Sequence, residues 1–395
     1  MIDYDDFINR TVAGLPPSGI RKFFDLANEV PGTISLGVGE PDFVTPWDIR
    51  AAAIRSLQNG KTQYTSNAGL VELREEIAVY LRERFFLEYR PKTELLVTVG
   101  ASEAIDLSLR AVVSPGDGVL VPTPSYVSYR PNITLVGGVP VPVPVRAETG
   151  FKLTPDELER AVTKNCKVLI LPYPNNPTGG VMTKAELEAI VPVIMRHNLL
   201  VLSDEIYAEL TYGGRHFSIA ALPGMWERTV LLSGFSKAFA MTGWRIGYLA
   251  APQPILNAVY RIHQYTVMCA STMSQYAALA ALRYGREERY RTVEEMGASY
   301  DMRRKYLYHE FVDMGLACFE PKGAFYLFPS VESLRMTGQA FAQALLTEEK
   351  IAVVPGDAFG ENGKYFIRCC YATSFKDLKT AAKRMRAFIG RRTGA

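Results

Sequence analysis

The sequence predicts an α/β protein whose main unit is a largely parallel sheet with helices on both faces. Short runs of consecutive apolar residues recur through the first two-thirds of the chain, and each is followed by turn residues and a segment of helical periodicity. A strand that is buried on both faces is apolar at successive positions, whereas a half-exposed strand alternates. The predicted strands are residues 95–99, 118–121, 167–171, 199–202, 229–232 and 247–250.

Helix start signals lie between these strands. Thr154 stands three residues before Glu157, and Thr183 stands three residues before Glu186. At this spacing a threonine hydroxyl accepts a hydrogen bond from the backbone N–H of the glutamate, and the carboxylate reaches back to the threonine N–H. We therefore predict that both threonines begin crossover helices of the parallel sheet.

Valine and proline alternate in the segment Val139-Pro-Val-Pro-Val-Pro-Val145. Because proline has no N–H group, such a segment can pair on at most one side. We predict a strand at the edge of the sheet, with a polyproline segment as the alternative.

The two ends of the chain differ from its middle. The segment up to Thr45 is rich in glycine and proline, which predicts an extended arm. After residue 286 the pattern predicts a smaller α+β unit, with a long charged helix, two strands and a basic helix at residues 287–314, 324–328, 365–369 and 377–389. We expect an N-terminal arm that forms part of the small domain, a large domain and a small C-terminal domain at residues 1–45, 46–285 and 286–395.

The charge balance argues against polyanionic partners. The 395 residues include 44 lysines and arginines and 41 aspartates and glutamates, which gives a formal net charge of +3. So small an excess provides no general attraction to nucleic acid or to a membrane surface. No apolar run reaches the roughly 18 residues of a membrane helix, and Asp3, Asp5 and Asp6 stand where a signal peptide would be basic and then apolar.

Cysteines and histidines predict neither disulfides nor a metal site. The five cysteines are scattered apart from the adjacent Cys369 and Cys370, and they form neither a disulfide framework nor a metal-binding knuckle. The four histidines lie far apart and lack the spacing of metal ligands. The expected location is the reducing cytoplasm.

Lys237 is a candidate nucleophile. It follows the strand at 229–232 in Leu232-Ser-Gly-Phe-Ser-Lys-Ala-Phe-Ala-Met-Thr-Gly-Trp-Arg-Ile-Gly-Tyr248, with Phe235 and Phe239 on either side. Burial at such a place lowers the pKa of a lysine and supplies the neutral amine that Schiff-base chemistry requires. The alternative is a solvated lysine in a surface loop.

Three further segments follow strands at the edge of the sheet where parallel α/β folds bind ligands. Asn176 lies in the turn Leu171-Pro-Tyr-Pro-Asn-Asn-Pro-Thr-Gly-Gly180, which alone indicates only a loop. Asp204 ends a buried strand three residues before Tyr207, with a helix N-cap as its alternative role. Ala101 and Ser102 open an apolar helix whose free N–H groups suit an anion such as phosphate.

Taken together, these segments resemble the class I and II aminotransferases, which have fold type I and depend on pyridoxal 5′-phosphate. The resemblance extends from about residue 17 to the C-terminus and includes Ser35-Leu-Gly-Val-Gly-Glu-Pro-Asp-Phe43, Tyr64-Thr-Ser-Asn-Ala-Gly-Leu70, Pro122-Thr-Pro-Ser-Tyr126 and Phe366-Ile-Arg368. It implies a three-layer α/β/α large domain with a mostly parallel seven-stranded sheet, and a smaller α+β domain.

The resemblance implies roles around the cofactor ring. Lys237 matches the lysine that bonds to the cofactor and then moves a proton between the substrate Cα and the cofactor C4′. Asp204 matches the carboxylate that pairs with the protonated ring nitrogen. Asn176 and Tyr207 match the two donors to the ring oxygen O3′, and Tyr126 matches the aromatic side chain that stacks on the ring.

A phosphate site is implied as well. The amides of Ala101 and Ser102 would hold the phosphate together with Arg245 in a charge-assisted bond. Tyr64 resembles the tyrosine that reaches the phosphate across a subunit interface, so the resemblance implies a homodimer. One position departs from the pattern: many relatives have a serine three residues before the lysine, where this chain has Gly234. Ser233 and Ser236 are both candidates to replace it.

On the substrate side, Arg368 matches the arginine that binds the α-carboxylate through two parallel hydrogen bonds. Gly39 would add a backbone contact to the same carboxylate, and Asn176 would also contact the substrate. Ile20, on the arm Pro17-Ser-Gly-Ile-Arg-Lys-Phe23, would cover the site.

The predicted function is transfer of an amino group between an L-amino acid, of the aspartate or aromatic type, and a 2-oxo acid by a ping-pong mechanism. The alternative on the same scaffold is an elimination, such as a C–S β-lyase or a ring-forming reaction, but Met241-Thr-Gly-Trp-Arg-Ile-Gly247 fits a transaminase better. A third hypothesis is the sensing domain of a transcription regulator. Those regulators carry an N-terminal helix-turn-helix, whereas about 45 arm-like residues precede the first helix of the large domain here.

Overall fold

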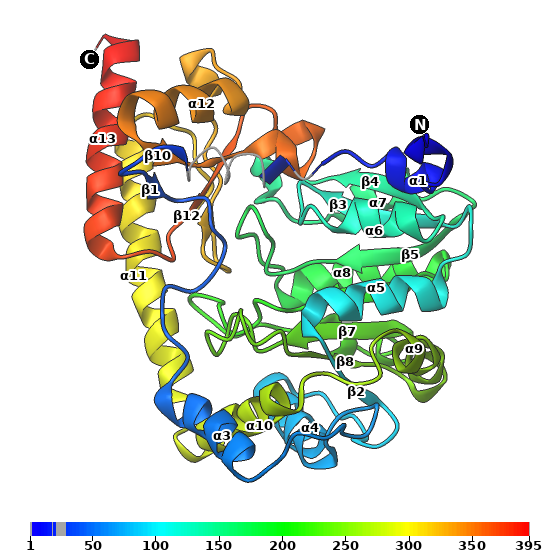
Figure 1. The fold of residues 1–395 in the computed structure, drawn as a ribbon. Coiled ribbons are helices and arrows are strands. Elements are labelled where there is room, and N and C mark those ends of the chain that lie inside the picture. The colour runs from blue at the N-terminus through cyan, green and yellow to red at the C-terminus, as the bar shows by residue number, and fades with distance from the viewer. Residues whose placement is uncertain (1, 18, 21–28, 395) are drawn as a thin grey trace.

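A seven-stranded sheet lies at the centre of the part of the chain that the structure describes (Figure 1). This computed structural model describes residues 2–17, 19–20 and 29–394, so part of the expected arm lies outside the described residues. The order across the sheet is β2 (Leu95–Thr98), β8 (Gly247–Ala250), β7 (Thr229–Gly234), β6 (Leu200–Asp204), β5 (Cys166–Leu171), β3 (Gly118–Thr123) and β4 (Val139–Pro144). Of these strands, β8 runs antiparallel to both neighbours, and the pairs from β7 to β4 are parallel. The expectation of a mostly parallel sheet is confirmed.

Helices cover both faces of this sheet, which explains why its strands are apolar at successive positions. In β5, Val168 and Ile170 pack on one face, whereas Leu169 and Leu171 pack on the other. The first face is covered by α5 (Gly100–Val112), α6 (Tyr129–Leu135) and α9 (Gln253–Thr266). The second is covered by α7 (Pro155–Ala161), α8 (Lys184–Arg196), α3 (Trp47–Gln58), α4 (Val71–Phe85) and α10 (Thr272–Glu287). The result is the three-layer α/β/α arrangement.

The predicted helix starts and the predicted edge strand are confirmed. The Thr154 hydroxyl accepts from the Glu157 N–H at the start of α7. Thr183 and Glu186 form a reciprocal capping box at the start of α8. Strand β4, with its alternating prolines, pairs with β3 and stands at the edge of the sheet.

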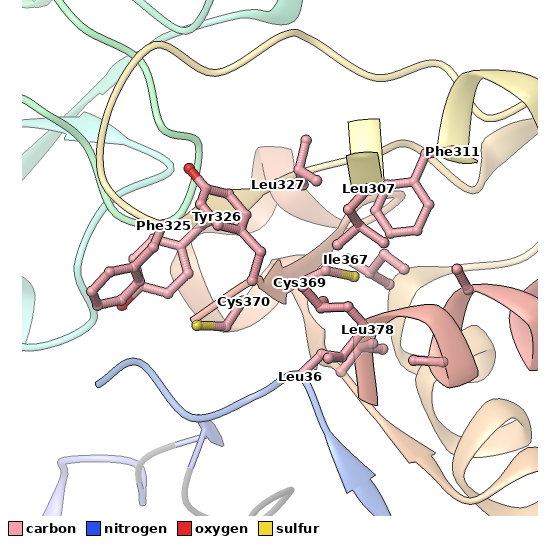
Figure 2. Packing of buried hydrophobic residues seen from close by; sticks show 14 of the residues in the cluster. Leu36, Leu307, Phe311, Phe325, Tyr326, Leu327, Ile367, Cys369, Cys370 and Leu378 are labelled. Carbon is pink, nitrogen blue, oxygen red and sulfur yellow. The ribbon is translucent and has the colours of Figure 1, made fainter. Parts of the chain in front are cut away.

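A smaller α+β unit combines both ends of the chain. Its helices are α11 (Arg291–Asp313), α12 (Gly338–Glu349) and α13 (Phe375–Thr393), and its strands are β1 (Ile34–Ser35), β9 (Tyr326–Leu327), β10 (Ile351–Ala352), β11 (Val354–Pro355) and β12 (Ile367–Cys370). Strand β1 pairs in parallel with β10, and β12 lies between β11 and β9. Figure 2 shows the core of this unit, where β9 and β12 contribute Tyr326, Leu327, Ile367 and Cys369. The boundaries at residues 45 and 285 stay a prediction.

Short 3₁₀ helices complete the described structure. They are η1 (Tyr4–Asp6), η2 (Ala147–Thr149), η3 (Ile219–Ala221), η4 (Trp226–Arg228), η5 (Glu332–Leu334), η6 (Gly356–Phe359) and η7 (Glu361–Gly363). The expectation of an extended arm is wrong at two short segments, where the chain forms η1 and the helical turn α1 (Arg10–Ala13). The Asn9 side chain stabilises α1 by accepting from the Thr11 N–H.

Backbone conformation corrects two further expectations. The helix expected at 287–314 begins at Arg291, because Arg289 and Tyr290 adopt φ values of 53° and 56°, which an α-helix cannot continue through. The strand expected at 324–328 is limited to β9, because Ala324 has a φ of 55°. None of the helices in the described ranges is both long and apolar enough to cross a bilayer.

Candidate active site

A cavity of about 700 Å³ lies at the edge of the sheet where the parallel strands end. Segments that follow β2, β3, β5, β6 and β7 line it, and so does the segment that precedes the antiparallel β8. Tyr326 of β9 and Arg368 of β12 close it from the small unit. Its lining includes the predicted residues Ile20, Gly39, Ala101, Ser102, Tyr126, Asn176, Asp204, Tyr207, Lys237, Arg245 and Arg368.

Tyr64 is the predicted site residue that does not line the cavity of its own chain. Its side chain is 80% exposed. This position neither provides nor excludes a contact with a second subunit, so the role of Tyr64 stays a prediction.

Lys237 lies in the wall of the cavity, beyond the end of β7. Its Nζ donates to the Gly39 carbonyl at 2.6 Å and lies 5.8 Å from the Tyr207 ring and 5.6 Å from the Phe325 ring. Burial lowers the pKa of this lysine to about 8, and this effect outweighs the opposing influence of Cys370 and Glu40. The solvated-loop alternative is therefore not what the structure shows.

Asp204 presents a buried carboxylate at the end of β6. Its oxygens accept from the Tyr129 hydroxyl at 2.7 Å and from the Ile206 N–H at 3.2 Å. Burial raises the pKa of Asp204 above its usual range, and these two hydrogen bonds oppose that rise. Its alternative role as a helix N-cap does not apply, because the next helical turn of the described chain is η3. A carboxylate in this setting gains most from a cationic partner.

Arg368 is buried and held by the protein on two sides. Its Nη1 donates to Asn176 Oδ1 at 2.9 Å, and its Nη2 donates to the Gly37 carbonyl. The guanidinium lies 4.4 Å from the Tyr326 ring centre. Its Nε is buried without a hydrogen-bond partner among the described residues. Because two of the five N–H groups of a guanidinium are used here, others remain to bind a carboxylate.

The guanidinium of Arg245 lies beside the start of α5. Gly100 has a φ of 74°, and a Cβ at this position would lie 2.7 Å from Arg245 Nη2. Glycine therefore lets the guanidinium approach the first turn of the helix, where the Ala101 and Ser102 N–H groups have no partners within the helix. Helix N–H groups and a guanidinium together suit a phosphate.

Close packing of strands explains the departure at Gly234. This residue pairs with Gly247 across β7 and β8, and a Cβ on Gly234 would lie 2.9 Å from the Gly247 Cα. A serine at 234 would need β8 to move. Ser236 lines the cavity, whereas the Ser233 hydroxyl donates to the Glu205 carbonyl at 3.4 Å. The geometry favours Ser236 of the two candidates.

Two tyrosines that hydrogen-bond to site residues were not predicted from the sequence. Tyr129 bonds to Asp204, and the Tyr326 hydroxyl lies 2.8 Å from the Tyr207 hydroxyl. The i, i+3 spacing of Tyr126 and Tyr129 is a signal that could have found the first, since their rings pack edge to face at 5.5 Å. No local pattern marks Tyr326, because it reaches the site only through the packing of the small unit.

Three histidines pair with carboxylates at 2.8 Å, namely His197 with Glu159, His216 with Glu205 and His263 with Glu103. No cluster of three or more metal-ligating side chains occurs among the residues that the structure describes.

This chain is similar to known aminotransferases in both sequence and structure. The family model for aminotransferase class I and II matches residues 31–385. A putative aminotransferase of Bacillus subtilis, YugH, is 52% identical over 387 residues, which are 98% of this chain and 99% of that protein. An aspartate aminotransferase of Pyrococcus abyssi is 46% identical over 370 residues, with 93% and 95% covered. The crystal structure of an aromatic aminotransferase of Pyrococcus horikoshii has a TM-score of 0.90 and 44% identity, and covers 95% of this chain and 100% of that one.

Proposed function

This chain belongs to the class I and II aminotransferases and is a transaminase, and on that premise we propose that the cavity is its active site and takes pyridoxal 5′-phosphate. The observation that carries the proposal is the convergence of Lys237, Asp204 and Arg368 on one cavity. Each has a distinct chemistry there: an amine of lowered pKa, a buried carboxylate and a fixed guanidinium.

The cavity residues fit this cofactor in two independent ways. Asp204 is a buried anion whose partners in the described structure are a phenol and a backbone amide, so a protonated ring nitrogen would supply the missing positive charge. The α5 start and Arg245 form an anion site that suits the phosphate. The residues that would hold the cofactor are Ala101, Ser102, Ser236 and Arg245 at the phosphate, and Tyr126, Asn176, Asp204 and Tyr207 at the ring.

When bound, pyridoxal 5′-phosphate supplies an electron-withdrawing ring that accommodates negative charge developed at the substrate Cα. Asp204 would keep the ring nitrogen protonated. Lys237, as a free amine, would remove the proton from the substrate Cα, a task for which an amine of pKa about 8 is suited near neutral pH. Arg368 would bind the α-carboxylate, and Asn176 would orient Arg368 through the bond from Nη1 to Oδ1.

For the amino donor we propose an aromatic or aspartate-type L-amino acid. Ile20, Val38, Val127 and Ile206 give the cavity an apolar wall that supports an aromatic side chain. The relatives described above carry both names, aspartate and aromatic aminotransferase. The test is a panel of L-amino acids with 2-oxoglutarate as acceptor, in which aromatic donors or aspartate should be consumed fastest. Release of ammonia and pyruvate without an acceptor would instead indicate the β-lyase that the comparisons do not favour.

Arg368→Lys should lower kcat/KM for every amino donor. An ammonium cannot form two parallel hydrogen bonds, so we expect a loss of about 10- to 100-fold, mainly through KM. Initial rates with an aromatic and an acidic donor measure this effect, and Arg196→Lys on the exposed end of α8 is the control. Because both donors share the α-carboxylate, a loss confined to one donor would contradict the assignment.

The pH dependence of cofactor attachment should report the lowered pKa of Lys237. Its amine is protonated below about pH 8 and neutral above it, so the rate at which apoenzyme binds pyridoxal 5′-phosphate covalently should rise through about pH 8. Stopped-flow absorbance between pH 6.5 and 9.5, a range of about 1.5 units on either side of the expected midpoint, measures this rate. A rate that is still rising steeply at pH 9.5, as the ordinary lysine value of 10.5 would give, would contradict burial of the amine.

We also propose a homodimer in which Tyr64 serves the partner's site. Large apolar side chains are exposed on the described surface, among them Tyr64 itself, Trp47, Ile54 and Leu57 on α3, and Tyr265 in the last turn of α9. Large exposed apolar side chains are typical of a subunit interface. All five cysteines are free thiols, which supports a reducing, cytoplasmic location.

Mixed dimers should test the role of Tyr64. A dimer of one Tyr64→Phe subunit and one Lys237→Ala subunit would hold one complete site if Tyr64 acts across the interface. We expect such mixed dimers to bind pyridoxal 5′-phosphate at that site with wild-type affinity, whereas the pure Tyr64→Phe dimer should bind more weakly by about tenfold or more, the effect of one lost hydrogen bond to a charged group. Cofactor titration of separately tagged and co-purified subunits measures both. Weak binding in the mixed dimer would place Tyr64 in its own subunit's site.

A further inference from the structure

We propose that the ion pair between Glu103 and His263 is a positioning element that joins the phosphate-binding start of α5 to the Tyr64 loop, defined as residues 62–69. The inference rests on the proposed binding of pyridoxal 5′-phosphate. Glu103 is in the first turn of α5, and His263 is in the last turn of α9. Neither residue lines the cavity, so both would act through the groups that they hold.

His263 is enclosed and bonded at both ring nitrogens. Its side chain is fully buried. Nδ1 lies 2.8 Å from Glu103 Oε1, and Nε2 lies 2.9 Å from the Asn67 carbonyl oxygen. The ring therefore bridges α5 and the Tyr64 loop through both of its nitrogens.

The charges of this pair suit the helix ends at which they lie. The positive end of the α5 dipole favours the Glu103 carboxylate, and the negative end of the α9 dipole favours positive charge on the His263 ring. Glu103 has a second role, because its Oε2 accepts from the Val99 N–H. Val99 is the N-cap of α5 and precedes Gly100, Ala101 and Ser102. The ion pair therefore fixes the turn whose free N–H groups line the cavity.

The other end of the bridge fixes the Tyr64 loop. Asn67, which accepts from His263, is three residues from Tyr64. A second buried side chain, Gln275, donates to Thr65 Oγ1 at 3.0 Å and accepts from the Leu70 N–H at 2.7 Å. The exposed Tyr64 is thus carried on a loop that is anchored from inside the protein. Of these anchors, His263 links the loop directly to the helix that would bind the phosphate.

The test separates the phosphate from the rest of the cofactor. Apoprotein is titrated with pyridoxal 5′-phosphate and, separately, with pyridoxal, which lacks the phosphate, and visible absorbance reports binding. For His263→Leu we expect affinity for pyridoxal 5′-phosphate to fall by about tenfold or more, as loss of charge-assisted hydrogen bonds implies, while affinity for pyridoxal stays within about twofold. The control is His197→Leu, which removes a histidine–carboxylate pair at the end of α8 and should change neither affinity.

Each result has one meaning. Equal losses for the two ligands, or no loss for either, would overturn the positioning role. If His263→Leu does not fold, Glu103→Ala decides, because it frees the Val99 N–H and His263 Nδ1 and should show the same phosphate-specific loss. If the wild-type apoprotein binds neither ligand, the proposed cofactor fails and the positioning role fails with it. If the wild-type apoprotein binds pyridoxal 5′-phosphate and His263→Leu binds it with the same affinity, the positioning role is wrong but the proposed cofactor is not.

Discussion

Replacing Lys237 by alanine is expected to abolish transamination and the covalent attachment of pyridoxal 5′-phosphate. The side chain has two proposed tasks, since its amine bonds to the cofactor and later moves the Cα proton. Loss of a general base alone costs about 10²- to 10⁴-fold in rate, and loss of the covalent attachment adds to it, so we expect kcat to fall by about 10⁴-fold. Single-turnover rates measure the first effect. Borohydride reduction followed by mass determination measures the second.

The fold of the Lys237→Ala variant should be unaffected, because the hydrogen bonding that the substitution removes among the described residues is a single bond, from the amine to the Gly39 carbonyl. Lys322→Ala, which removes an exposed lysine paired with Glu320, is the matched control and should retain full activity. A cofactor linkage that borohydride still reduces in Lys237→Ala would refute the assignment of this lysine.

Asp204→Asn should have the second largest effect. The substitution keeps the shape of the side chain, and its amide oxygen can still accept from Tyr129, but it removes the negative charge. Without that charge a buried ring nitrogen is deprotonated and withdraws electrons poorly. We expect kcat to fall by about 10²- to 10³-fold, the range seen when a preorganised electrostatic partner is lost. Steady-state rates with a good donor measure the loss.

Tyr129→Phe is the companion variant for Asp204. It removes the 2.7 Å hydrogen bond to the carboxylate and leaves the charge in place. Its effect on kcat should be about tenfold, at the lower end of what one hydrogen bond to a charged group contributes, because the charge of Asp204 stays in place. If Asp204→Asn lost no more activity than Tyr129→Phe, the charge of Asp204 would not be what the reaction requires.

Local patterns were enough to predict the sheet and the positions of reactive residues along the chain. A strand such as β5 must bury Val168 on one face and Leu169 on the other, so consecutive apolar residues already indicate a sheet covered twice. The carboxyl ends of parallel strands share one edge, so residues after β5, β6 and β7 could be expected to meet. The resemblance to aminotransferases then assigned roles to those residues.

Local sequence patterns did not predict where the backbone leaves the regular helical conformation or where two strands pack closely. Positive φ values at Arg289 and Tyr290 divide a stretch of helix-forming residues into α10 and α11. Both residues can also occur within helices, and it is packing that holds Tyr290 in place, since its ring lies over Gly285 and beside Tyr80. Gly234 likewise departed from the family pattern for a reason that only the neighbouring strand β8 reveals.

The amino-acid order alone specified the fold class, the helix starts at Thr154 and Thr183, and the set of reactive side chains, because these depend on periodicity and on neighbours a few residues apart. Packing in three dimensions decided which of them touch. Arg368 and Asn176 are 192 residues apart in the chain, and His263 spans from Asn67 to Glu103. Such contacts depend on strand order, on helix packing and on both ends of the chain forming the small unit. Local sequence patterns do not specify strand order or helix packing. It is this packing that brings the reactive residues together in one active site.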